Sequence, residues 1–281
     1  MKKSYSKNLK TVFVLSIIIA SLGSCNKDKV TIDTDQQAAQ DNAQAEYVFS
    51  DVNNIVDDAA RSQGGVNKMA GNNFGCANIT RDSSTAATNY FPKTLTCIWD
   101  STCTPASTTE NKRKGKMIIK FSAPFSQTGA VITTTFEKFS VNGYLVEGTR
   151  TLTNDGPNAV KNQSYTINID GKITSSLGKV VTIVNANTKE ITDTKGTPDS
   201  KDDTYQITGN SSGSSATGGF KAIIKTPLIV DRSSCKYITK GTVELTPAGG
   251  KAVRYIDFGD GTCDNKITVK IANTTYNLLL P

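Results

Sequence analysis

After about residue 74 the chain alternates apolar and polar side chains with a period of two. The alternation is clearest in SYTINID (164–170), GFKAIIKT (219–226) and KITVKI (266–271). Successive side chains of a strand point to opposite faces, so each segment predicts an antiparallel strand with one buried and one solvated face. Glycine- and asparagine-rich corners such as NDGPN (154–158) and AGG (248–250) predict tight turns between the strands. We therefore predict a mainly β fold, an antiparallel meander of about ten to twelve strands in a hairpin-rich sheet or sandwich.

One segment ahead of the strands has a helical period instead. Apolar side chains recur there every three or four positions, and they are Ala45, Val48, Val52, Ile55, Val56 and Ala59. The polar side chains on the opposite side are Asp51, Asn54, Asp57 and Asp58. These positions predict one N-terminal amphipathic helix over residues 42–62, ended near the QGG at 63–65, which packs its apolar stripe on the sheet. Its acidic side is predicted to face away from the sheet.

The first 24 residues have the composition of an export signal. Four lysines precede the run TVFVLSIIIA (11–20), which is too short to span a bilayer as a helix. The next four residues, Leu22–Cys25, read LGSC and resemble the lipobox of bacterial lipoproteins, where cleavage before the cysteine accompanies acylation of its thiol. The resemblance implies a signal peptide over 1–24 and a membrane anchor of acyl chains, palmitate among them, on Cys25. An ordinary secretory signal with a coincidental cysteine is the alternative.

The rest of the chain divides into a tether, the helix and one domain. Residues 25–41 are polar, lack a core pattern and predict a lipidated flexible tether, whereas residues 63–281 predict a single β-rich domain. Cleavage after residue 24 would remove four lysines and no acid, so the net charge would fall from +7 to about +3. No basic run remains, and we expect no nucleic-acid partner.

The five cysteines after Cys25 would meet an oxidising compartment, where pairing is the rule. Cys235 and Cys263 flank a predicted hairpin whose turn is centred on Gly249. Residues opposed across an antiparallel hairpin are equidistant from its turn, which places these two cysteines opposite one another and predicts a disulfide.

The upstream cysteines are Cys76, Cys97 and Cys103. We favour a Cys76–Cys103 disulfide that leaves Cys97 as a buried or partly buried thiol. The pairing of Cys76 with Cys97 is the alternative. The sequence around Cys97 gives no electropositive neighbourhood that would make a free thiol reactive.

Several ordered segments carry a wider resemblance. They are FPKTLT (91–96), RKGKMIIKFS (113–122), VITTTFEKFSVNGYLVEGTRTLTN (131–154), TYQITGNSSG (204–213), CKYITKGTVEL (235–245) and IDFGDGTCDNKITVKI (256–271). Together they resemble a family of Bacteroidota-type outer-membrane lipoproteins of uncharacterised function, over about residues 70–280. The resemblance implies export, lipidation and a β-rich body, and it supplies no activity or catalytic residue. Cys97 lies where the family more often has an aliphatic residue.

The chain contains no histidine. This excludes nucleophiles activated by histidine and metal sites built on imidazole. The GNSSG at 209–213 matches the G-x-S-x-G pattern around Ser211, but without histidine it predicts a flexible turn. Carboxylate-only chemistry, as in glycoside hydrolysis, needs two acids and remains open. Candidate acids are Glu147, Asp170, Asp257 and Asp260, and nothing in the sequence directs any two of them at one point.

Three carboxylates surround two glycines in the segment near the C-terminus, on Asp257, Asp260 and Asp264. Oxygen ligands suit Ca²⁺, so these residues are a candidate calcium site, although their spacing does not fit an EF-hand loop. The alternative is a sharp corner in which Gly259 and Gly261 supply positive φ and the aspartates accept local backbone N–H groups.

From these observations we predict a lipid-anchored, non-catalytic cell-envelope protein, a binding or structural module at the outer membrane. Its partners would be the membrane, through the acyl chains on Cys25, and an envelope protein or glycan. Whether it faces the periplasm or the cell surface stays open. The alternatives are a carboxylate-based glycan-processing enzyme and a carrier of a small ligand or glycan inside a partly closed sheet.

Overall fold

Thirteen strands and one helix make up the part of the chain that the computed structural model describes. The described residues are 33–61, 74–82, 91–105, 110–196, 202–233 and 235–280. They fall within one structural unit, Asp33–Pro281. The predicted signal peptide, the anchor residue Cys25 and the QGG expected at the end of the helix lie outside the described residues.

The strands follow one another around the sheet in chain order. The helix is α1 (Gln37–Arg61), and the strands are β1 (Asn78–Asp82), β2 (Lys93–Trp99), β3 (Arg113–Phe121), β4 (Val131–Val141), β5 (Tyr144–Pro157), β6 (Gln163–Thr174), β7 (Val180–Asp193), β8 (Thr204–Ser215), β9 (Gly218–Asp231), β10 (Lys240–Pro247), β11 (Arg254–Asp260), β12 (Lys266–Ile271) and β13 (Thr274–Leu279). Each strand pairs antiparallel with the one before it in a single sheet. The predicted antiparallel meander with one packed helix is therefore confirmed.

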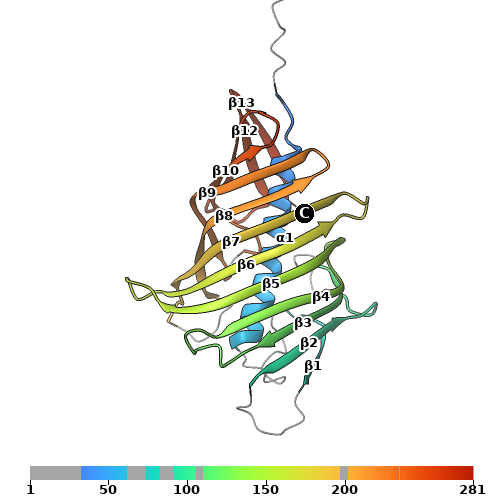
Figure 1. Ribbon diagram of the computed structural model, residues 1–281, viewed down its shortest axis with the longest axis vertical. Coiled ribbons are helices and arrows are strands. Elements are labelled where there is room, and N and C mark those ends of the chain that lie inside the picture. The colour runs from blue at the N-terminus through green and yellow to red at the C-terminus, as the bar shows by residue number, and fades with distance from the viewer. Residues whose placement is uncertain are drawn as a thin grey trace, which may run out of the picture. The chain divides into compact units, whose positions relative to one another are not determined.

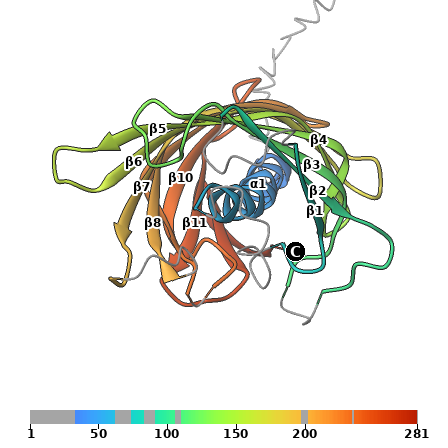
Figure 2. The same ribbon diagram turned by 90° about the horizontal axis from the view of Figure 1, so that it is seen from below.

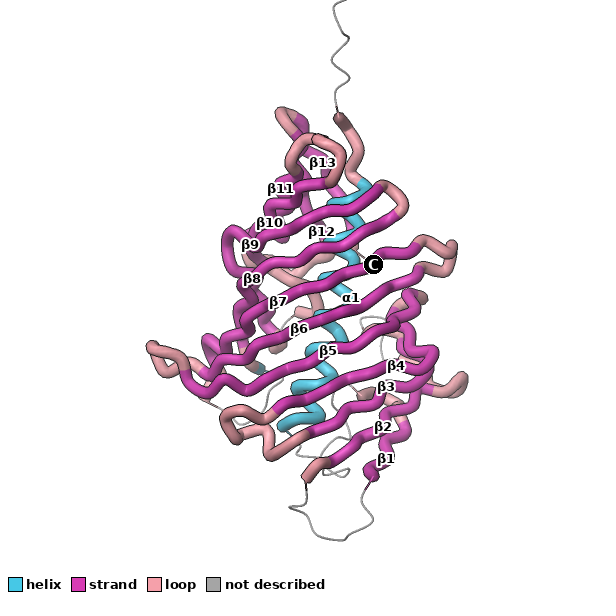
Figure 3. The backbone as a smooth tube through the Cα atoms, viewed as in Figure 1, coloured by secondary structure: helices cyan, strands magenta, loops and turns pink. Residues whose placement is uncertain are grey.

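The sheet curls around α1. Figure 1 shows the helix axis crossing the strands, and Figure 2 shows the helix inside the curve of the sheet. The N-terminal end of α1 lies near β12 and β13, and its C-terminal end lies toward β3 and β4 (Figure 3). The inner face of nearly every strand therefore lies toward the helix, and the outer face lies toward solvent.

The period of two seen in the sequence is the alternation between these two faces. On β6, Tyr165, Ile167 and Ile169 are buried, as predicted. On β12 the same holds for Ile267 and Val269, which alternate with exposed or half-buried residues. Inward side chains of this kind, together with the apolar residues of α1, form one continuous core.

The predicted acidic outer side of the helix is wrong. Every residue of α1 is buried except Gln37, Gln40, Gln44 and Arg61. The aspartates expected to point away from the sheet are enclosed like the apolar ones, because the sheet curls far enough to meet the helix on several sides. Between Ala45 and Ala60 the helix has no solvated face, and its acids need partners from the strands.

The segment predicted as a tether is docked from Asp33 onward. The Asp33 carboxylate pairs with the guanidinium of Arg254 at 2.7 Å, and Asp35 pairs with Lys251 at 2.7 Å. Asp35 also accepts a hydrogen bond from the backbone N–H of Gln37 at 2.9 Å, as an N-cap residue does. The helix consequently begins at Gln37, earlier than the predicted residue 42.

Both predicted disulfides are present. Cys235 and Cys263 have their Cα atoms 5.5 Å apart, and those of Cys76 and Cys103 are 5.2 Å apart. Cys97 is the buried free thiol. Burial raises the pKa of this thiol to about 12, so it carries no thiolate at neutral pH and is not a reactive group.

The hairpin argument that paired Cys235 with Cys263 is wrong in detail. Val243 lies opposite Ile256, one position away from the register that a turn centred on Gly249 requires. A bulge at Gly241 shifts the register again, and a Cβ there would lie 2.4 Å from the carbonyl oxygen of Pro227. Both cysteines lie beyond the ladder, in the loops that follow β9 and β11, where the chain has freedom to bring them together.

Candidate functional site

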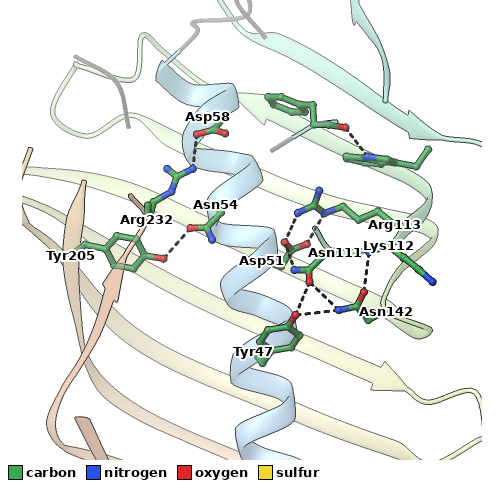
Figure 4. A network of polar contacts seen from close by, with 12 residues as sticks. Tyr47, Asp51, Asn54, Asp58, Asn111, Lys112, Arg113, Asn142, Tyr205 and Arg232 are labelled. Atoms are coloured by element: carbon green, nitrogen blue, oxygen red, sulfur yellow. Dashed lines mark hydrogen bonds and ion pairs between the residues drawn. The ribbon is translucent and has the colours of Figure 1, made fainter. Parts of the chain in front are cut away.

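A buried layer of charges joins α1 to the inner face of the sheet. Its ion pairs are Asp51 with Arg113, Asp57 with Lys189, Asp58 with Arg232 and Arg61 with Asp203. We call these eight residues the helix–sheet polar layer. The Asp51 and Asp58 pairs, with the neighbouring hydrogen bonds of Asn54 and Tyr205, are drawn in Figure 4. Because four strands or strand ends supply the partners, the layer fixes the helix against distant parts of the sheet.

A hydrogen-bonded chain extends the layer at Tyr47. The Tyr47 hydroxyl donates to the Asn111 side-chain oxygen at 2.6 Å, and the Asn111 amide donates to Asp51 at 2.7 Å. The Asn142 amide donates to both Tyr47 and Asn111, at 3.1 and 2.9 Å (Figure 4). The Nε of Arg113 donates to the other Asp51 oxygen at 2.7 Å. The turn after β4 and the start of β3 are thereby held on one side of the helix.

Asp57 and Lys189, the most deeply buried pair of the layer with a lysine, both carry their charges at neutral pH. Burial opposes ionisation of Asp57, but Lys189 and Arg232 together hold the pKa of its carboxyl below the usual value. Burial lowers the pKa of Lys189 to about 8, which still leaves the ammonium charged at pH 7. Arg150 is a further buried cation, whose Nε donates to Asn53 at 2.5 Å. Apart from Arg61, whose side chain is 26 % exposed, the layer is largely closed to solvent, and its charges are paired, which suits a structural role.

Glu46 of α1 is buried, and no cation offsets the effect of burial on the pKa of its carboxyl. Burial alone raises the pKa of its carboxyl from 4.5 to about 7. Between these two values the folded state binds the proton more tightly than the unfolded state does. The contribution of Glu46 to stability is therefore full below pH 4.5 and is lost as the pH rises through about 7.

We expect Glu46→Gln to raise the free energy of unfolding by about 2–3 kcal/mol at pH 8, because the amide has no proton to lose. At pH 4.5 the same change should have little effect. Urea unfolding at the two pH values measures both. Glu137, exposed and paired with Lys116 at 2.6 Å, supplies the control Glu137→Gln, which should change stability little at either pH. A gain at pH 4.5 equal to that at pH 8 would contradict the raised pKa.

The outer face of β5–β8 carries an open hollow of about 400 Å³. The polar side chains around it are Thr149, Thr151, Asn168, Asp170, Asn210 and Ser212. They form two rows across the strands, because Thr149 lies opposite Asp170 and Thr151 lies opposite Asn168. Val184 and Ala186 on β7 continue these rows toward β8. This hollow could not be predicted from the sequence, since it depends on which side chains neighbour one another across four strands.

The carboxylates considered for catalysis are not gathered at that hollow. Asp170 is the one acid among the described residues that line it. Glu147 on β5 pairs instead with Lys172 on β6, at 2.7 Å between exposed side chains. A glycosidase mechanism needs a second carboxylate facing the same substrate position, and these residues do not supply it there.

The candidate calcium residues lie around a second open hollow, of about 360 Å³. Asp257, Asp260 and Asp264 each accept a backbone N–H two residues further on, at 2.9, 3.0 and 2.9 Å. Gly259 and Gly261 have φ of 112° and 116°. Across the described residues, no three His, Cys, Asp or Glu side chains are grouped as metal ligands. The geometry is that of the sharp corner, with each carboxylate oriented by its own turn.

No family model, curated protein or solved structure matches the chain. In the part of the chain that the structure describes, no helix is long and apolar enough to cross a membrane. Function must therefore be inferred from the two faces of the sheet and from the sequence ahead of Asp33.

Proposed function

We propose that this protein is a lipid-anchored, non-catalytic cell-envelope module that presents the outer face of its sheet to a partner at the outer membrane. The observation that carries the proposal is the burial of α1. The helix occupies the inner face of the sheet, so the outer face is the large surface left for binding. The LGSC motif that ends at Cys25 supports the anchor.

The same observation favours a binding module over the two alternatives. A carrier would need its ligand inside the curved sheet, where α1 lies with almost all of its residues buried. A glycan-processing enzyme would need two converging carboxylates, whereas Asp170 is the one acid among the described residues that line the hollow on β5–β8, beside hydroxyl and amide groups and the apolar Val184 and Ala186. The hydroxyl and amide groups suit hydrogen bonding to an uncharged polar partner, a glycan or a protein loop.

The anchor is tested by replacing the lipidated residue in cells that process exported lipoproteins. The full chain should incorporate an alkyne-labelled palmitate and float with membranes, whereas Cys25→Ala should do neither. Cys97→Ala is the matched control, since it removes a buried thiol of the folded domain and should keep both label and flotation. Label retained in the Cys25→Ala protein would contradict the anchor.

The binding face is tested in the same cells by a photo-reactive amino acid. At Ala186, in the hollow of β5–β8, it should give a discrete cross-linked product in intact envelopes. At Thr80, which is exposed on β1, it should give several-fold less. Equal cross-linking at the two positions would contradict presentation through this face and leave the anchor result unaffected.

A further inference from the structure

Asp33 and Asp35 attach the chain ahead of α1 to a fixed point on the sheet. Asp33 accepts the backbone N–H of Ala252 at 3.1 Å and pairs with the buried Arg254, and Asp35 pairs with Lys251. All three partners lie in the hairpin between β10 and β11 or at its end. Only residues 26–32 separate Asp33 from Cys25, and a chain of that length spans at most about 29 Å. A lipid on Cys25 therefore keeps this end of the domain close to the bilayer.

The end of the domain near Asp33 is formed by β13. Arg254 lies opposite Ile271 on β12, and Ile271 lies opposite Thr274 on β13. Two strand spacings amount to about 10 Å, so the first residue of β13 is that close to the docking point of Asp33. Figure 1 places β12 and β13 beside the N-terminal end of α1, and β1 at the opposite end of the sheet.

The two edges of the sheet differ in chemistry. β1 includes Arg81 and Asp82, charged residues of the kind that keep edge strands from pairing with other strands. β13 reads TTYNLL and has no charge, although among the described residues no further strand pairs with it. Leu279 is 65 % exposed on the outer face of the strand, whereas Tyr276 points to the opposite face and packs in part against the core. Such an edge needs a cover.

The neighbouring strand adds basic residues to this edge. Lys266 lies opposite Leu279, and Lys270 lies opposite Thr275, both with exposed side chains. An exposed leucine bordered by lysines matches the interfacial region of a bilayer, where methyl groups enter the headgroup layer and ammonium groups meet lipid phosphates.

We propose that the outer edge of β13, with Leu279, Lys266 and Lys270, rests on the lipid headgroups of the membrane that holds the anchor. The inference rests on the lipid anchor of the proposed function. It fixes the orientation of the domain: β13 is proximal to the membrane, β1 is distal, and the hollow on β5–β8 faces sideways at a height set by the intervening strands.

The test uses the lipidated protein in vesicles of phosphatidylethanolamine and phosphatidylglycerol. A fraction of the lipids in each vesicle carries brominated acyl chains, which quench fluorescence. A fluorescent amino acid is introduced at Leu279 in one preparation and at Thr80, on β1, in another. Bromolipid should quench the probe at Leu279 several-fold more than the probe at Thr80. Equal quenching, or stronger quenching at Thr80, would overturn the proposed orientation.

Flotation of the same vesicles separates this inference from the proposed function. Protein that fails to float lacks the anchor, whereas protein that floats without preferential quenching at Leu279 refutes the orientation alone. Energy transfer between Leu279 probes, without quenching by lipid, would assign the edge to a second copy and would also refute it. The charge-reversal pair Lys266→Glu and Lys270→Glu should lower quenching while flotation stays unchanged. The melting curve should change little, because Lys266 has a 71 % exposed side chain and its pair with Asp264 is long, at 3.7 Å.

Discussion

Replacing Asp57 with alanine is expected to lower the free energy of unfolding by about 3–5 kcal/mol, because it leaves the buried Lys189 without its counter-ion. The Lys189 side chain is 2 % exposed, and the Asp57 carboxylate also stabilises the charge of Arg232. Urea unfolding followed by the fluorescence of Trp99, the single tryptophan of the chain, measures the loss. The contribution of the carboxylate is present above its unfolded pKa of 3.8 and is lost as the pH falls through its lowered folded pKa.

Two further variants separate burial from charge. Asp193→Ala removes an exposed carboxylate that pairs with Lys195, and it should change stability very little. The double variant Asp57→Ala with Lys189→Met removes both buried charges and should recover most of the loss. If Asp57→Ala cost no more than Asp193→Ala, the ion pair would not be the buried, partner-dependent contact that the structure contains.

The alternating strands could be predicted because a sheet with one wet face imposes its period on the sequence. Tyr165, Ile167 and Ile169 are predicted and found on one buried face, and the chain-order meander follows from short turns between such strands. The strand number, thirteen in the described residues, lies just above the expected range. Local pattern decides these features, and no long-range contact is needed to infer them.

The environment of α1 could not be predicted from the helix alone. The sequence pattern of a helix with an acidic side is the same whether that side faces water or a row of buried cations. The signal lay in the strands, where Arg150 shares the inward phase of Leu152 and Lys189 shares that of Ile191. A cation in the inward position of a strand requires a buried polar partner, and α1 supplies Asp57 to Lys189 and Asn53 to Arg150.

The hairpin register could not be predicted either, because the bulge at Gly241 depends on the close approach of the Pro227 carbonyl from β9. The predicted pairing of Cys235 with Cys263 is correct all the same, because both cysteines lie in loops outside the ladder. The hollow on β5–β8 depends in the same way on neighbours that come together only in the folded sheet.

Replacing both Cys235 and Cys263 with alanine is expected to lower the free energy of unfolding by about 3–4 kcal/mol, from the closure of a loop with a sequence separation of 28. The bond also fixes the segment after β9, whose Tyr237 stacks on Tyr47 of α1 with ring centroids 5.4 Å apart. Loosening that segment removes one of the contacts that close the sheet around the helix.

Urea unfolding of the oxidised proteins measures this effect, and reduction supplies an internal comparison. Reduced wild-type protein lacks both disulfides and should be less stable than the oxidised double variant, which lacks one. The difference should equal the contribution of the Cys76–Cys103 bond, whose loop is nearly as long. Cys97→Ala, which removes a thiol outside both bonds, should respond to reduction as the wild type does. A loss below about 1 kcal/mol in the Cys235→Ala and Cys263→Ala protein would mean that the two loops are already ordered by the bulged ladder and by α1.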